Sequence, residues 1–191
     1  MIRIIDRDDI DAIKFAFAAK GNDEYLCIRD NQVIGIDGRR IHRAKLNTTF
    51  ADDGLYNILK NSRKEIILDR ISDDSNYYSQ DLIESHFDMR GKFVKIVELD
   101  SELVAKGSLL ASSIVYLVGM NRQAINPQYI LDVCKIIETR LPCSVTVTLP
   151  TDPNSPILIK QNDITSIEAL IMPVIVHEDI RKQLEEVGKN E

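Results

Sequence analysis

Apolar residues recur every three to four positions in the stretch after Asn126, a spacing that places them on one face of a helix. Asn126 suits the N-cap. Pro127 suits the first turn, because a helix start leaves backbone N–H groups without partners and proline has none to lose. From Ser144 to Leu149 the spacing changes, since polar and β-branched residues alternate as in a half-buried strand. The helical stripe consists of Ile130, Val133, Cys134 and Ile137.

Two more strands are predicted after this one. A turn rich in Asp, Pro and Asn occupies residues 151–156, and the apolar segments 156–160 and 168–176 follow it. The chain from 126 to 176 therefore reads as helix, strand, turn, strand, loop and strand. This order predicts a helix packed on an antiparallel sheet.

The first 46 residues show a related order. A short strand over residues 1–6 precedes a helix that Asp6 or Asp8 caps and that extends to Lys20. Three strands follow in quick succession, joined by tight turns at Asp30-Asn31 and Asp37-Gly38. The predicted strands cover residues 24–29, 32–37 and 40–46. The expected buried face of the helix carries Ile10, Ile13, Phe17 and Ala18.

A weaker repeat of this order is predicted over residues 48–99. It has a strand at 48–50, a helix that begins at Asp52 or Asp53, and strands at 65–71 and 91–99. The helix would continue through Leu55, Ile58 and Leu59. The polar segment 73–90 predicts weak strand and loop. Residues 100–123 fit either a helix capped by Ser101 or a strand that ends near Gly119, and residues 177–191 predict a short surface helix with a frayed tail.

Composition narrows the class of protein. With 191 residues, 44% apolar and 28% charged, the chain can bury the core of one large or two small domains and is typical of a globular protein. No run approaches the ~18 apolar residues of a membrane span, and the N-terminus carries charges where a signal peptide needs an apolar core. We therefore expect a cytoplasmic protein with no membrane partner.

Catalytic and metal-binding chemistry find little support in the sequence. The three cysteines are widely spaced in apolar segments, which suits buried thiols better than a disulfide framework or a zinc site. The three histidines are scattered, and no Gly-rich phosphate loop or nucleophile motif is present. We expect no enzymatic activity, no metal and no cofactor.

Four short segments resemble, in the same order, the end of the bacterial DNA polymerase III beta subunit, the DNA sliding clamp. They are the Asn-x-x-Tyr-Ile-Leu-Asp helix start at 126–132, Val-Thr-Val-Thr-Leu at 145–149, Asn-Ser-Pro-Ile-Leu-Ile at 154–159, and Leu-Ile-Met-Pro-Val at 170–174. The resemblance implies an α+β, DNA-clamp-like fold. Such a fold has antiparallel sheets with helices packed on one face, in repeated strand-helix-three-strand halves.

The resemblance also implies a division of the chain and a function. Residues 1–99 would form one clamp-like domain, 100–176 a truncated second clamp-like domain, and 177–191 a helical tail. The alternative is one clamp domain with a long insertion between residues 49 and 120. The implied function is that of a processivity factor that encircles duplex DNA without reading its sequence. It would tether a DNA polymerase or other clamp-binding peptides through a pocket. A ring of six similar domains would make a two-domain chain a homo-oligomer of three copies.

The alternative is a clamp-fold module that binds peptides or proteins without encircling DNA. The shortened middle of the chain and the acidic start of the first helix favour it. A net charge of −6 also counts against DNA binding, because affinity for DNA depends on neutralising phosphates. A protein that encircles DNA, however, needs basic residues only on its lining. Both functions stay open at this point.

A further segment, Ile36 to Ile41, resembles the family's Thr-Asp-Gly-His-Arg-Leu turn, which lines one side of the peptide pocket. The other side is the Met-Pro strand. Ile36 and Arg39 depart from the family's threonine and histidine. The same residues also fit an ordinary hairpin turn and a core strand. The predicted pocket residues are Ile36, Gly38, Arg39, Arg40, Ile41, Leu170, Met172, Pro173 and Val174.

Basic residues assigned to the predicted helices are the candidates for facing DNA. In the family the helices line the hole and contact phosphates without reading bases. A solvated helix face is the competing interpretation for each residue. The candidates are Lys14, Lys20, Lys60, Arg63, Lys64, Lys135 and Arg140.

Overall fold

The structure is a computed structural model of the chain. It describes residues 1–20, 25–49, 52–73, 87, 93–98, 116–118, 123–126, 128–130, 132–133, 145–150, 152, 154–161, 167–173, 178–179 and 182.

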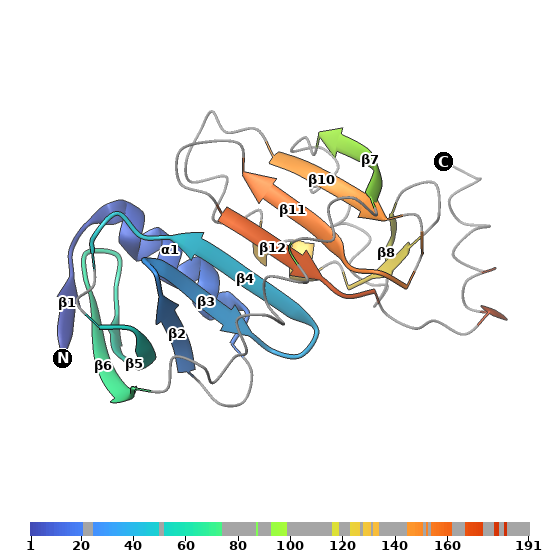
Figure 1. Cartoon of the computed structure of the whole chain (residues 1–191). Helices are drawn as coiled ribbons and strands as arrows, with labels where there is room; N and C mark the ends of the chain where they lie inside the picture. Colours follow the sequence, from blue (N-terminus) through green and yellow to red (C-terminus); the bar gives the residue numbers. More distant parts are fainter. Residues whose placement is uncertain are drawn as a thin grey trace.

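Ten strands form one antiparallel sheet (Figure 1), in the order β1-β6-β5-β2-β3-β4-β12-β11-β10-β7. The strands from residues 1–72 make up one side of this sheet and the later strands the other, so that β4 and β12 meet in the middle. The ten strands are β1 (Ile2–Ile4), β2 (Tyr25–Arg29), β3 (Gln32–Ile36), β4 (Arg40–Lys45), β5 (Gly54–Asn61), β6 (Ile66–Ser72), β7 (Phe93–Glu98), β10 (Val145–Pro150), β11 (Ile157–Gln161) and β12 (Ile167–Ile171). A separate antiparallel pair joins β8 (Tyr116–Val118) to β9 (Gln123–Ile125).

The helix α1 (Arg7–Ala18) begins as the sequence predicts. The Asp6 carboxylate accepts hydrogen bonds from the backbone N–H groups of Asp8 and Asp9, each at 3.0 Å, and so caps the first turn. The buried face differs from the expected one at its C-terminal end. Phe15 and Ala16 are fully buried there, whereas Phe17 and Ala18, predicted to face the core, are only half-buried.

Both predicted tight turns are confirmed. Asp30 and Asn31 have φ angles of 49° and 58°, the left-handed pair that a two-residue hairpin turn between β2 and β3 requires. Gly38 has φ of 77° between β3 and β4, where a residue with a Cβ atom would be strained. The three predicted strands of residues 24–46 are therefore found as β2, β3 and β4.

The predicted helix at residues 52–59 is wrong, because Gly54 to Asn61 form the strand β5. Leu55 is buried in the cluster on one face of the sheet, and Tyr56 is buried in the cluster on the other. A strand buried on both faces loses the polar-apolar alternation that identifies a half-buried strand, and its apolar spacing then imitates a helix. Thr48 and Thr49, predicted as strand, lie outside any strand.

The strand-helix-three-strand order occurs a second time over residues 123–171, where the sequence predicted a helix and three strands, and not over residues 48–99. β9 precedes helical residues 128–130 and 132–133, and β10, β11 and β12 follow. Asn126 caps this helical segment as expected, since its side-chain oxygen accepts the N–H of Gln128 at 2.9 Å. β7 pairs with β10 rather than with a strand of residues 1–72, although it falls within the predicted first domain.

Apolar side chains are buried on both faces of the sheet. On the helix face, defined as the face that α1 covers, Val133 joins the same cluster as Ile13 and Phe15, so both helical segments pack on one side (Figure 1). The opposite face, called the second face below, carries a smaller cluster. Its members are Cys27, Ile34, Leu55, Phe87, Leu158 and Leu170.

The remaining predictions are tested only in part. The strand at 65–71 is found as β6, the one at 91–99 as β7, and those at 144–149 and 156–160 as β10 and β11. The final strand ends at Ile171, earlier than predicted. Residues 116–118 agree with the strand that was expected to end near Gly119, and residues 178, 179 and 182 are helical as predicted for the tail. The predictions for 74–86, 88–90 and the Ser101 cap lie outside the described residues.

Candidate functional site

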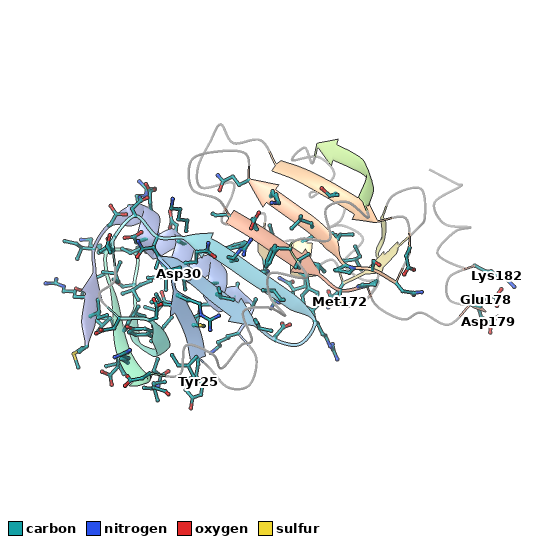
Figure 2. The ribbon with its side chains drawn as sticks, in the orientation of Figure 1. Tyr25, Asp30, Met172, Glu178, Asp179 and Lys182 are labelled. Atoms are coloured by element: carbon teal, nitrogen blue, oxygen red, sulfur yellow. The ribbon has the colours of Figure 1, made fainter. Side chains whose placement is uncertain are left out.

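The turn at Asp37-Gly38 and the segment at Met172 meet within one chain. β12 pairs with β4 so that Leu170 lies opposite Ile41 and Ile171 opposite Arg40. Just beyond the strand, the backbone N–H of Met172 donates to the carbonyl oxygen of Arg39 at 2.8 Å. The two segments singled out in the sequence, far apart along the chain, are therefore direct neighbours. This meeting of the Asp37-Gly38 turn with Met172, where β4 pairs with β12, is called the junction below, and Figure 2 shows Met172 there.

An apolar row crosses the second face at this junction. Ile36 lies opposite Ile41, Ile41 opposite Leu170, and Leu170 opposite Leu158 on four adjacent strands. Residues directly opposite one another in antiparallel strands project to the same face and contact each other. The row is covered at one end, where Leu158 and Leu170 are buried, and partly accessible at the other, where Ile36 and Ile41 are half-buried.

Exposed groups flank the accessible end of this row. Met172 is 37% exposed and Pro173 is half-buried, while Gly38 and Arg39 are exposed at the tip of the β3–β4 turn. The Asp37 carboxylate holds this turn by accepting the backbone N–H groups of Arg39 and Arg40, each at 2.9 Å. The junction therefore presents an apolar strip beside a fixed turn. Val174 lies outside the described residues.

Arg40 does not take part in this strip, although the sequence placed it in the pocket. Its Nε donates to Asp37 at 2.8 Å, its Nη1 donates to Asp132 at 2.6 Å, and its guanidinium carbon stands 4.4 Å from the centre of the Tyr129 ring. Burial alone would lower the pKa of Arg40, but hydrogen bonds and charge from Asp132 and Asp37 outweigh it and raise that pKa. Arg40 thus ties the turn to the helical segment of the later part of the chain.

A buried ladder of charges lies next to the apolar row on the second face. Ile34 lies opposite Arg43, Arg43 opposite Glu168, and Glu168 opposite Lys160. Arg43 binds Glu168 through Nε at 3.0 Å and Nη2 at 2.5 Å, and Lys160 pairs with the other oxygen of Glu168. Burial raises the pKa of Glu168, but the hydrogen bonds from Lys160 and Arg43 outweigh it and hold that pKa below its usual value.

The candidate DNA-facing residues do not form one surface on helices. Lys14 is half-buried on α1, and Lys20 lies over the Phe17 ring, 4.3 Å from its centre. Lys60 belongs to the strand β5 and pairs with Glu65, a correction that follows from the wrong helix at 52–59. The exposed Arg63 and Lys64 lie in the β5–β6 turn, and Lys135 and Arg140 lie outside the described residues.

Two buried polar residues, one on α1 and one on β4, escape sequence reasoning. Asp9, fully buried, accepts the backbone N–H groups of Asn47 at 2.6 Å and Thr48 at 3.0 Å. His42 is fully buried on β4 and bonds through Nδ1 to the carbonyl oxygen of Phe15 at 2.7 Å, with the two rings stacked 4.4 Å apart. Burial lowers the pKa of His42 to about 4. No local pattern marks either residue.

The described residues offer no metal site and no membrane span. Among them, no group of three or more His, Cys, Asp or Glu side chains could hold a metal ion. No helix in the described part of the chain is long and apolar enough to cross a membrane. Cys27 is a buried thiol outside any disulfide, as predicted, whereas Cys134 and Cys143 lie outside the described residues.

Solved structures of bacterial clamps share this fold. The DNA polymerase sliding clamp of Pseudomonas aeruginosa superposes with a TM-score of 0.61 at 14% identity, over 92% of this chain and 66% of its own length. The DNA polymerase III beta subunit of Thermotoga maritima gives 0.60 at 14% identity, over 93% and 66%. The beta sliding clamp of C. crescentus gives 0.58 at 14% identity, over 92% and 65%.

These likenesses establish the fold. No family model matches the sequence, and no curated protein matches it. The chain spans slightly less than two thirds of the length of the clamps named above. It has an α+β, DNA-clamp-like fold, in which both helical segments cover one face of an antiparallel sheet.

Proposed function

We propose that the chain is a processivity factor of the sliding-clamp type. As a homo-oligomer it encircles duplex DNA, and it tethers a DNA polymerase or another partner through the junction of β4 and β12. The observation that carries the proposal is the meeting of the Asp37-Gly38 turn with Met172 on a clamp-like fold. The function requires no chemical step, metal or cofactor.

The junction has the properties of a site for short extended peptides. Ile36 and Ile41 offer a half-buried apolar strip, and Met172 adds a flexible thioether that adapts to different side chains. The exposed backbone of Gly38 and the side chain of Arg39 supply polar groups at the rim. An apolar floor with a few fixed polar groups is the usual arrangement of a peptide site.

The DNA half of the proposal rests on the one-sided packing of the helices. When both helical segments cover the same face, closing several such sheets into a ring with that face inward would line the hole with helices. Binding by encirclement needs few phosphate contacts, so an acidic chain can hold DNA topologically. Two clamp-like domains in each chain would require three chains for a ring of six.

Retention on DNA of different topology tests this function directly. The full chain is incubated with nicked circular DNA, washed at high salt to remove electrostatic binding, and then treated with an enzyme that linearises the DNA. We expect a trimer by light scattering, retention on the circle, and release when the circle is cut. A monomer at high concentration, or equal loss from circular and linear DNA at high salt, would refute encirclement.

A second candidate is a clamp-fold module that binds peptides without encircling DNA. The observation that favours it is the charge of α1, where the exposed or half-buried Asp8 and Asp11 accompany the basic residues Arg7 and Lys14. Carboxylates on the helix face would repel phosphates. This module would be a monomer or dimer, and linearising the DNA would not change the amount of protein bound to it. Its affinity for a peptide would be weakened by Met172→Ala.

A further inference from the structure

Two aliphatic side chains protrude from the pair of strands β5 and β6, which together with their turn are called the β5–β6 ribbon below. The register between the strands shifts at Leu59 in β5 and at Ile71 in β6, so that each strand has one extra residue. An extra residue of this kind bends the strand and re-aims a side chain. Leu59 is 53% exposed and Ile71 is 48% exposed.

Both side chains point to the second face. Ile58 and Leu68 pack in the helix-face cluster, and successive residues of a strand point to opposite faces, so Leu59 and Ile71 turn away from it. The half-buried Ile67, opposite Lys60, lies between them and about 13 Å along β6 from Ile71. The ribbon is at the end of the sheet away from β12 (Figure 1), so this surface is separate from the junction.

The turn end of the ribbon is basic. Arg63 and Lys64 are exposed there, and neither forms an ion pair with any of the described residues. The turn that presents them is fixed, because Ser62 Oγ accepts the backbone N–H of Glu65 at 3.0 Å and donates to its carbonyl oxygen at 2.8 Å. The other cations at this end, both paired with the Glu65 carboxylate, are Arg3 and Lys60.

The opposite end of the ribbon is acidic. The side chain of Asp73 is 89% exposed and that of Asp52 is 60% exposed, and the half-buried Asp53 lies beside them in the chain. Arg70 pairs with Asp73 at 2.9 Å and with Asp52 at 3.8 Å. The ribbon therefore carries opposite charges at its two ends, with the exposed aliphatic side chains between them.

We propose that the β5–β6 ribbon is a self-association surface, on which a second copy of the chain packs second face to second face with its strands reversed. A two-fold axis across the ribbon then brings the basic end of each copy to the acidic end of the other, and Leu59 to Ile71, so every contact is made twice. A second copy fits because it carries the same charges at the same spacing. Asp69, near the centre, is offset by the Met1 amino group at 3.6 Å.

This inference goes beyond the proposed function and does not depend on it. A ring with the helix face inward would carry the ribbon on its outside, where it could meet the ribbon of another ring. Charge complementarity at both ends also sets the direction of packing, because strands in the same direction would place like charges together.

Reversing the charges of one end at a time tests the pairing. The turn-end variant, Arg63→Glu with Lys64→Glu, has two acidic ends, and the acidic-end variant, Asp52→Lys with Asp73→Lys, has two basic ends. Each should self-associate at least about tenfold more weakly than the wild type at low ionic strength, because attraction becomes repulsion at both contacts. An equal mixture of the two variants is complementary at both contacts and should associate as tightly as the wild type. Energy transfer between donor- and acceptor-labelled full chains measures the association.

Two further variants serve as controls. Lys45→Glu reverses an exposed cation on β4, two residues from Arg43 and therefore on the second face but outside the ribbon, and its association should equal that of the wild type. Leu59→Ser removes apolar contact without a change of charge and should weaken association about tenfold. The substituted side chains are largely exposed, so each variant should keep the circular dichroism spectrum of the wild type.

The outcomes separate this inference from the proposed function. Energy transfer in the mixture no greater than in either variant alone would overturn the pairing, since a different partner of either charge would not respond to the swap. Unchanged self-association of the turn-end variant would overturn it as well. Exchange of chains within rings would contribute equally to every sample and cancels in the comparison. Retention on circular DNA without pairing would overturn this inference alone, and pairing without retention would overturn encirclement alone.

Discussion

His42 should make the stability of the chain fall as pH decreases from about 6.5 to about 4. The ring is fully buried on β4, and burial lowers its pKa from 6.5 to about 4. The hydrogen bond to the Phe15 carbonyl raises this pKa in part, and the positive charge of Arg40 lowers it further. Asp132 and Asp37 favour the protonated form but do not reverse the effect. The Nδ1 atom must donate to the Phe15 carbonyl, which can only accept, so the neutral ring leaves Nε2 buried without a hydrogen-bond partner among the described residues.

The sign and size of the effect follow from the two pKa values. In the unfolded chain His42 is protonated below pH 6.5, whereas in the folded chain it stays neutral down to about pH 4. The unfolded state therefore binds more protons in this window, and the free energy of unfolding falls as pH decreases through it. At about 1.4 kcal/mol for each pH unit, the loss approaches about 3 kcal/mol and then levels off. Above pH 6.5 the residue contributes no slope.

Urea unfolding of the wild type and of His42→Gln at pH 7.5, 6.5, 5.5 and 4.5, at one protein concentration, measures this loss. Glutamine can still donate to the Phe15 carbonyl but does not titrate. We expect the wild type to lose about 2.5 kcal/mol relative to the variant between pH 7.5 and 4.5. All carboxylates are common to both proteins, so their contributions cancel in the difference. Parallel curves would refute the assignment of a buried neutral histidine.

Three further substitutions, two of them with a comparison variant, test the packing of the sheet. Arg40→Ala leaves two carboxylates without their cation and should cost about 3 kcal/mol in urea unfolding, whereas Arg39→Ala, at the exposed neighbour, should cost less than about 0.5 kcal/mol. Gly35→Ala would place a Cβ atom 1.9 Å from a backbone oxygen of α1, so we expect little folded protein by circular dichroism. Gly38→Ala, with open space but φ of 77°, should cost only about 1 to 2 kcal/mol. Glu168→Gln should destabilise at pH 7 by about 2 kcal/mol, and because the pKa of this carboxyl is lowered, its difference from the wild type should shrink as pH falls below 4.5.

The parts of the fold that local chemistry dictates were predictable from the sequence. Asp6 and Asn126 cap helices because their short side chains reach free N–H groups, and Gly38 marks a turn because the turn needs a positive φ. β5 was not predictable in this way. Its apolar residues pack on both faces of the sheet, which only the positions of β2 and β6 explain.

The junction shows the same division between local and long-range information. The sequence predicted that the Asp37-Gly38 turn and Met172 belong to one site, and the structure brings them together. No pattern in the sequence indicated that Arg40 binds Asp132, or that Phe87 lies in one cluster with Leu158 and Leu170. Both facts depend on residues distant along the chain, for which no periodic pattern exists.

The pairing of β4 with β12 has a consequence for how the chain reaches its fold during synthesis. The partner residues Arg43 and Glu168 are 125 positions apart, so β4 has no neighbour on that side until most of the chain has left the ribosome. An unpaired strand edge is a template for pairing with another molecule, and contacts of long sequence separation form slowly. Nascent chains that stop before residue 167 therefore expose the central strand of the finished sheet as an open edge, where a chaperone or another nascent chain would bind.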